Sequence, residues 1–204
     1  MRFRRFVGLL VANIGILAFC QDHPDKIRLC FVGPNDLADM SSPKFEQYAV
    51  GTSPLQSIGK LDLQSNPVAR MYRTVIRQQM KEGPNFANHY LVAIWGCGTS
   101  CAQFAVVNLE NGRVITPKGV VSVSGDHFMT DGFLPSTDSE GWGFRYKHDS
   151  RLLVLVGTIN EDDSREGAFY YELAGDELKL VHKTIAHRNT CKYESVPDWK
   201  SPGH

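Results

Sequence analysis

The fold of this chain is decided by residues 84–114, which read PNFANHYLVAIWGCGTSCAQFAVVNLENGRV. Two apolar runs, His89–Trp95 and Ala102–Leu109, flank a short link that contains glycine and cysteine. Both runs are short and rich in β-branched and aromatic residues, which favours two strands of a hairpin. We therefore predict a hairpin at the centre of a sheet, with Cys97 and Cys101 facing each other across a closed tip at the sheet's edge.

The first twenty residues differ from the rest of the chain. Met1–Arg5 is basic and Phe6–Phe19 is almost wholly apolar, which is the pattern of a secretory signal peptide. The apolar run is shorter than a membrane span. Cleavage after Cys20 suits the small residues at that point, whereas a lipid anchor on Cys20 is disfavoured by the bulky Phe19. We expect residues 1–20 to be removed and the protein to be periplasmic or secreted.

The composition excludes several classes of protein. A hydrophobic content of 42% and a charged content of 22% are those of a globular protein. Loss of residues 1–20 leaves 19 basic and 22 acidic residues, a net charge of −3, which does not suggest nucleic acid as a partner. We expect no cofactor, no nucleic acid and no transmembrane segment in the mature chain, and the composition fixes no oligomeric state.

Four cysteines remain after cleavage: Cys30, Cys97, Cys101 and Cys191. An even number in an exported chain predicts disulfides, and of three pairings we favour Cys97–Cys101 with Cys30–Cys191. The chain-entropy model gives about 2 kcal/mol for the small ring and about 5 kcal/mol for the terminal clamp. The spacing of the hairpin pair lacks the features of a redox centre or a zinc site, so we expect a structural staple and no metal.

Residues 21–65 contain many turn-forming residues and predict an extended arm, with short strands at Ile27–Val32 and Phe45–Val50. The arm is expected to lie over the body and cover sheet edges. Asn66–Glu82 predicts a helix that Asn66 caps and Gly83 ends. Its expected core stripe is Val68, Met71, Tyr72, Val75, Ile76 and Met80. Its basic ridge is Arg70, Arg73, Arg77 and Lys81, which favours a solvated face over a docking site for an anionic partner.

Strands and turns follow the hairpin. The expected strands lie within Val114–Val123, Phe144–Tyr146, Leu152–Val156, Ala168–Leu173 and Leu178–Thr184. Ser124–Gly143 predicts a long polar loop and residues 188–204 an irregular tail. The sequence thus predicts an α+β fold in one domain, residues 66–187, with a single helix near the N-terminus packed on a twisted antiparallel β-meander sheet stapled by a disulfide.

Several of these pieces together resemble a group of small exported bacterial proteins of unknown function. The resemblance covers roughly residues 60–182, and its most specific parts are Gly83–His89 with Tyr90 (GPNFAxHY) and Trp95–Cys101 (WGCGxxC). The resembling proteins often carry glycine where this chain has Asn88, and many have a further cysteine pair near the acidic turn that is absent here. The resemblance implies export and a stapled hairpin, and it implies no activity.

The hairpin tip is the leading candidate for a binding site. A stapled tip loses little entropy on binding, so Gly98, Thr99 and Ser100 form a rigid finger beside Trp95. Tryptophan is enriched in binding hot spots, although core packing is the commoner role for Trp95. We therefore expect a non-enzymatic exported domain that binds a protein or cell-envelope component, in an inhibitor-like or immunity-like manner.

Two polar groups carry the alternatives. Asn85 and His89 could orient a substrate, but a hydrogen-bonded loop histidine explains them equally well. Asp126 and His127 supply a carboxylate and an imidazole in the long loop, without any recognised catalytic motif. A hydrolase that uses His89 or the Asp126/His127 pair is therefore one alternative, and a structural lipoprotein anchored at Cys20 is another.

Overall fold

The computed structural model describes residues 26–30, 42–124, 143–186 and 191–195. The chain divides into two compact units, Leu29–Lys192 and Met1–Arg28 with Tyr193–His204. The predicted signal peptide lies outside the described residues. No helix in the described ranges has the length and apolar character that a bilayer crossing needs.

Strands β1 (Lys26–Cys30) and β10 (Cys191–Ser195) pair as a separate two-stranded sheet. The prediction of an irregular C-terminal tail is wrong over β10, because the segment finds a partner strand distant in the sequence. The pair unites the strands that contain Cys30 and Cys191, and the disulfide between these cysteines stays a prediction.

The larger unit contains a mostly antiparallel sheet of eight strands. These are β2 (Tyr90–Gly98), β3 (Cys101–Asn108), β4 (Val114–Ile115), β5 (Val123–Ser124), β6 (Phe144–Tyr146), β7 (Leu152–Ile159), β8 (Glu166–Ala174) and β9 (Glu177–Ile185). The order is β2-β3-β5-β7-β8-β9, with β4 beside β3 and β6 beside β7.

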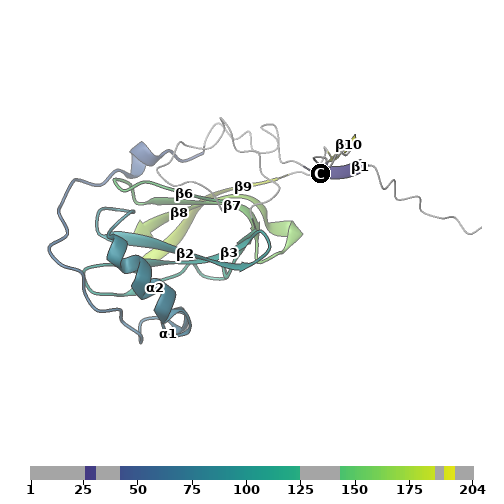
Figure 1. Cartoon of the computed structure of the whole chain (residues 1–204). Helices are drawn as coiled ribbons and strands as arrows, with labels where there is room; N and C mark the ends of the chain where they lie inside the picture. The colour runs from purple at the N-terminus through teal and green to yellow at the C-terminus, as the bar shows by residue number, and fades with distance from the viewer. Residues whose placement is uncertain (1–25, 31–41, 125–142, 187–190, 196–204) are drawn as a thin grey trace, which may run out of the picture. The chain divides into compact units, whose positions relative to one another are not determined.

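The two-residue strand β5 joins two halves of this sheet. Val123 pairs with Ala102 of β3 on one side and with Ile159 of β7 on the other. Alternate residues of β3 and of β7 and β8 point into one shared core, which includes Phe104, Leu155 and Phe169. The halves therefore pack their inner faces against each other (Figure 1).

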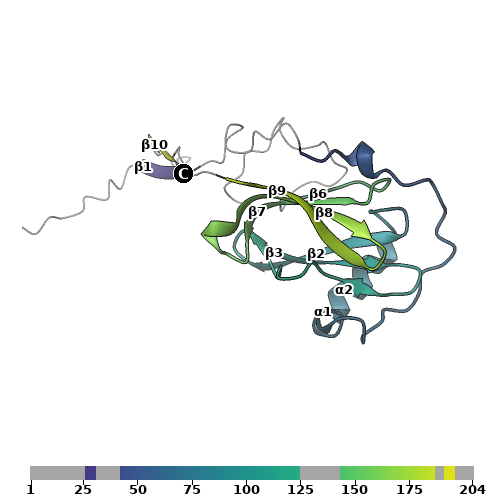
Figure 2. The ribbon, with the colours of Figure 1, turned by 180° about the vertical axis from the view of Figure 1, so that it is seen from behind.

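The outer faces of the two halves are covered by different segments. The outer face of β2 and β3 packs against the helical segment, where Ala69, Ile76 and Met80 are buried with Ala93 and Val107. The outer face of β7 and β8 packs against Phe45. Figure 2 shows the body from behind, where β9, in yellow-green, follows β8. Strands β7 and β8 are apolar on both faces because both faces are covered.

The predicted hairpin is confirmed, and its predicted place in the sheet is wrong. Tyr90 to Gly96 pair in register with Asn108 to Ala102, and Cys97 is bonded to Cys101. However, β2 is an edge strand and not a central one. The hairpin is apolar because it lies between the helical segment and the shared core, which buries both of its faces.

The helix expected over 66–82 is divided into α1 (Pro67–Met71), α2 (Arg73–Gln79) and a 3-10 turn, η2 (Met80–Glu82). Asn66 accepts a hydrogen bond from the Val68 N–H, as predicted for its cap. The helix breaks at Tyr72, where φ is −109° and ψ is 22°. The prediction of Met71 as a core residue is wrong, since its side chain is 70% exposed. The residues that face the core are Ala69, Tyr72, Ile76 and Met80, at helical spacings of three and four, and Met71 lies on the opposite side of that stripe.

The expected strand over Phe45–Val50 is instead a 3-10 turn, η1 (Phe45–Tyr48), followed by a single β-bridge at Ala49. The buried Ser150 hydroxyl donates to the Phe45 carbonyl at 2.9 Å, and the Arg151 N–H donates to the Tyr48 carbonyl at 2.9 Å. These bonds hold the segment as a turn, and they place Phe45 over the outer face of β7 and β8.

Candidate functional site

The disulfide-closed tip projects from the end of the β2–β3 hairpin. Cys97 and Cys101 are bonded with their Cα atoms 5.2 Å apart, and a two-residue turn, Thr99–Ser100, connects Gly98 to Cys101. Cys101 is buried, whereas Gly96 to Thr99 are exposed and Ser100 is half-buried. The tip is thus a covalently closed and exposed turn, as the sequence predicted.

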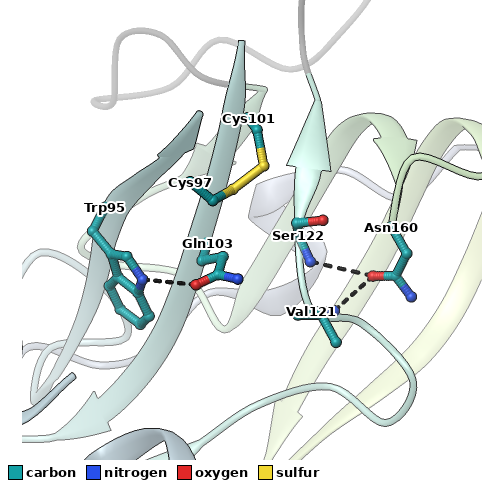
Figure 3. The surroundings of a disulfide bond; sticks show 7 residues. All are labelled: Trp95, Cys97, Cys101, Gln103, Val121, Ser122 and Asn160. Atoms are coloured by element: carbon teal, nitrogen blue, oxygen red, sulfur yellow. Dashed lines mark hydrogen bonds between the residues drawn. A yellow bond between two sulfur atoms is a disulfide. The ribbon is translucent and has the colours of Figure 1, made fainter. Parts of the chain in front are cut away.

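Trp95 forms one wall of a groove beside the tip. Its indole N–H donates to Gln103 Oε1 at 3.0 Å, and its ring lies against Tyr72 with centroids 4.5 Å apart (Figure 3). The groove has a volume of about 470 Å³, and its lining includes Met71 and Val121. We call it the tryptophan groove. Trp95 therefore packs on the core beneath α1 and α2, the commoner of its two predicted roles, and it also lines an open surface. Its role in binding stays a prediction.

The far wall of the tryptophan groove is held by Asn160. Its side-chain oxygen accepts from the Val121 and Ser122 N–H groups at 2.7 and 3.2 Å (Figure 3), and its amide donates to the Gly119 carbonyl at 2.9 Å. Val121 is nevertheless 63% exposed. The wall is thus fixed by backbone hydrogen bonds while it presents an apolar side chain to solvent.

The Asn85 side chain is engaged by the main chain at the β2 edge. That side chain accepts from the Val92 N–H at 2.7 Å and donates to the Val92 carbonyl at 3.3 Å. Gln79 forms the same pair of bonds with Ile94, at 3.0 and 2.7 Å. Tyr90 is bonded to the main chain of Phe86. Side chains and a turn therefore take the place of a neighbouring strand along most of β2.

His89 is also engaged within the fold. Its Nε2 donates to the Ser53 carbonyl at 2.8 Å, and its Nδ1 lies 3.0 Å from Glu110 Oε1. The neighbouring Asn88 is buried, has φ of 63°, a conformation that glycine and asparagine adopt most readily, and donates to the Gly51 carbonyl. Both ring nitrogens of His89 are occupied, which leaves neither free for acid–base catalysis. The geometry thus gives no support to the hydrolase alternative at His89.

The other predicted site residues lie outside the described ranges. These are Asp126 and His127, together with all of the Ser124–Gly143 loop except its ends. Ser124 itself pairs with Cys101, so the chain enters this loop next to the disulfide. Within the described ranges no group of three or more His, Cys, Asp or Glu side chains gathers to hold a metal ion.

Comparison of the chain with protein-family models, with curated proteins and with solved structures finds no match. The resemblance to small exported bacterial proteins therefore stays a prediction.

Sequence reasoning missed the residues that complete the tryptophan groove. Met71 fits a helical spacing with Val68 and Val75, and Val121 belongs to an apolar run, and both signals favour core positions. Met71 is exposed because the stripe that faces the core runs through Ala69 and Ile76 instead. A local signal did exist for Asn160, since asparagine readily adopts the positive φ of 57° found there.

Proposed function

We propose that this chain is an exported, non-enzymatic binding protein of the bacterial cell envelope, and that it holds a protein partner through the stapled tip and the tryptophan groove. The observation that carries this proposal is an apolar groove placed directly beside a covalently closed, exposed turn. Aromatic and methionine side chains of this kind are enriched where proteins bind one another.

The energetics favour binding at this surface. Met71 and Val121 are 70% and 63% exposed on the two sides of the groove, and burying each would contribute on the order of 1.5–3 kcal/mol. Before any partner arrives, the Trp95–Gln103 bond and the Asn160 bonds restrain the two walls, and the disulfide restrains the tip. Little ordering cost is therefore set against the gain from burial.

The hydrogen bonds already made along the edge of β2 limit the ways in which a partner can bind there. Outward main-chain groups at Tyr90, Val92 and Ile94 are already bonded, so a partner cannot add a strand along that length. Main-chain groups of alternate residues point away from β3, so the next outward position after Ile94 is Gly96. No described residue outside the sheet forms a hydrogen bond with the main chain of Gly96. We infer that the partner inserts apolar side chains into the groove and makes at most a short main-chain contact at Gly96.

The disulfide supports export, since such bonds persist in oxidising compartments. An inhibitor-like or immunity-like role is the form of binding that a rigid finger serves best, and it rests on physical analogy alone.

The test uses a photo-crosslinking residue placed at Thr99 or at Val121, with a third placement at Ile58 as the control. Ile58 is also exposed and apolar and does not line the groove. Proteins captured from an envelope extract at the first two positions and not at Ile58 are then purified, and their affinity for the chain is measured.

Met71→Glu and Thr99→Arg should each weaken binding of the captured partner by about tenfold or more, which corresponds to about 1.4 kcal/mol. The matched variant Ile58→Glu should stay within about twofold, well under 1 kcal/mol on the same scale. Equal capture at Ile58, or an affinity that neither groove variant changes, would remove this surface from consideration.

A further inference from the structure

A second groove, of about 470 Å³, opens between β9 and the segments around Lys118 and Arg165. We call it the basic groove. It is lined by side chains from the 116–122 segment, from η3 (Asp163–Arg165), from β8 and from β9. Its volume falls within the range of small-ligand sites, which is roughly 300–1,000 Å³. The 116–122 segment thus meets the distant stretch from η3 through β9 at one concave surface.

The lining is strongly cationic. Lys118, Arg165, Lys179 and Lys183 line the groove, against one acidic residue, Glu177. Arg165 donates to the Gly119 carbonyl at 3.0 Å. Across the described ranges Lys118, Lys179 and Lys183 form no ion pair. Elsewhere on the same sheet, by contrast, Arg151 is paired with Glu172 at 2.8 Å. An excess of cationic over acidic side chains raises the local potential for an anion.

The floor of the basic groove is apolar apart from the hydroxyl of Tyr171. Phe169 and Tyr171 belong to the shared core and are 4% and 5% exposed. Burial raises the pKa of Tyr171 more than the charge of Arg165 lowers it, so the hydroxyl is a proton donor at neutral pH. No described group forms a hydrogen bond with that hydroxyl. At the rim of the groove, the apolar side chain of Leu180 on β9 is 49% exposed.

We propose that the basic groove binds a small, free amphiphilic anion, namely a carboxylate or phosphate ester with an acyl or aryl part. Lys179 and Lys183 with the Tyr171 hydroxyl would hold the charged group, and Phe169 and Leu180 would contact the apolar part. Each part of the ligand matches a feature of the groove. The charged group matches the unpaired lysines and the unbonded tyrosine hydroxyl, and the apolar part matches the exposed leucine. Apart from Lys118, which lines both grooves, this site uses other residues than the proposed protein-binding surface, and it stands if that proposal fails.

The experiment measures binding to the full oxidised chain by calorimetry with three probes. Octyl phosphate, below its micelle concentration, carries both features. Octyl glucoside carries the chain without the charge, and inorganic phosphate the charge without the chain. We expect octyl phosphate to bind at least about tenfold more tightly than either of the others. A result in which phosphate or octyl glucoside binds as tightly overturns the proposal, and so does the absence of binding by octyl phosphate.

Two variants locate the site. Lys179→Gln/Lys183→Gln should weaken octyl phosphate binding about tenfold or more, while Arg77→Gln/Lys81→Gln, with the same loss of charge on α2 and η2, should change it less than about twofold. Tyr171→Phe, with its fold checked by circular dichroism, should weaken binding about threefold to tenfold, the effect of one hydrogen bond to a charged group. Equal losses in both lysine and control variants, or tighter binding to anionic vesicles than to octyl phosphate, would contradict the proposal.

Discussion

The two edges of the sheet are protected in different ways. Along β2 the outward main-chain groups of Val92 and Ile94 are bonded by the amide side chains of Asn85 and Gln79. Strand β9, at the other end of the sheet, carries Lys179 and Lys183 beside its exposed apolar side chains. One edge is closed by hydrogen bonds from its neighbours, whereas the other is guarded by charge.

This difference shows how edge protection and binding can be combined. Where amides occupy the backbone of β2, the surface next to it is left to side chains, which suits the tryptophan groove. Where lysines guard β9, the same lysines face the basic groove and are available to an anion. The means of protection thus determines the kind of ligand that each side of the molecule can accept.

The largest expected effect comes from opening the β2 edge. The double variant Asn85→Ala/Gln79→Ala removes four part-buried hydrogen bonds and should lower the free energy of unfolding by about 3–5 kcal/mol. Urea denaturation measures it. Gln78→Ala is the control, because Gln78 is exposed on the same helix, and it should change stability by less than about 0.5 kcal/mol. A loss below about 1 kcal/mol in the double variant would mean that the amides are not what closes this edge.

A smaller effect is expected where the β2 edge ends. Cys97→Ala/Cys101→Ala removes the small ring and should cost about 2 kcal/mol on the chain-entropy model. Thermal unfolding of oxidised wild type and variant gives this difference. Thiol titration of the unfolded wild type is the control. If it finds the thiols of Cys97 and Cys101 free, the disulfide is absent and the prediction fails.

The smallest change in stability is expected at β9, where charge and not bonding protects the edge. Lys179→Thr/Lys183→Thr should alter the free energy of unfolding by less than about 0.5 kcal/mol. Self-association should rise because the edge loses its repulsion. Sedimentation velocity over a concentration series measures this, with Arg77→Thr/Lys81→Thr as the charge-matched control. If both pairs of substitutions promote association equally, net charge and not the edge is responsible.

Local patterns predicted the parts of the fold that depend on neighbouring residues. The apolar runs around Cys97 and Cys101 defined the hairpin and its staple, and Asn66 followed by Pro67 located the start of the helical segment. The strands after the hairpin were also found, because alternation and turn residues lie within a few positions of each other. The pattern could not place β2 at an edge, since burial by a helical segment and burial by neighbouring strands give the same apolar run.

In the candidate site too, the features set by neighbouring residues were predictable, and those set by distant residues were not. The exposed tip was predictable because a glycine-rich link between two strands has to be a turn. The roles of Asn85 and His89 were not, since their partners, Val92 and Ser53, are chosen by the path of the chain in space. The tryptophan groove depends on which of two overlapping helical stripes faces the core and on the Asn160 bonds, neither of which a periodic pattern decides.

The Asn160 bonds have a consequence for both surfaces. Lys118 lines the tryptophan groove and the basic groove alike, and the segment that follows it, through Gly119 and Val121, is bonded to Asn160. A ligand that moved this segment from one side would change the width of the space on the other. Occupants of the two grooves would therefore be thermodynamically linked, each altering the affinity of the other by the same factor.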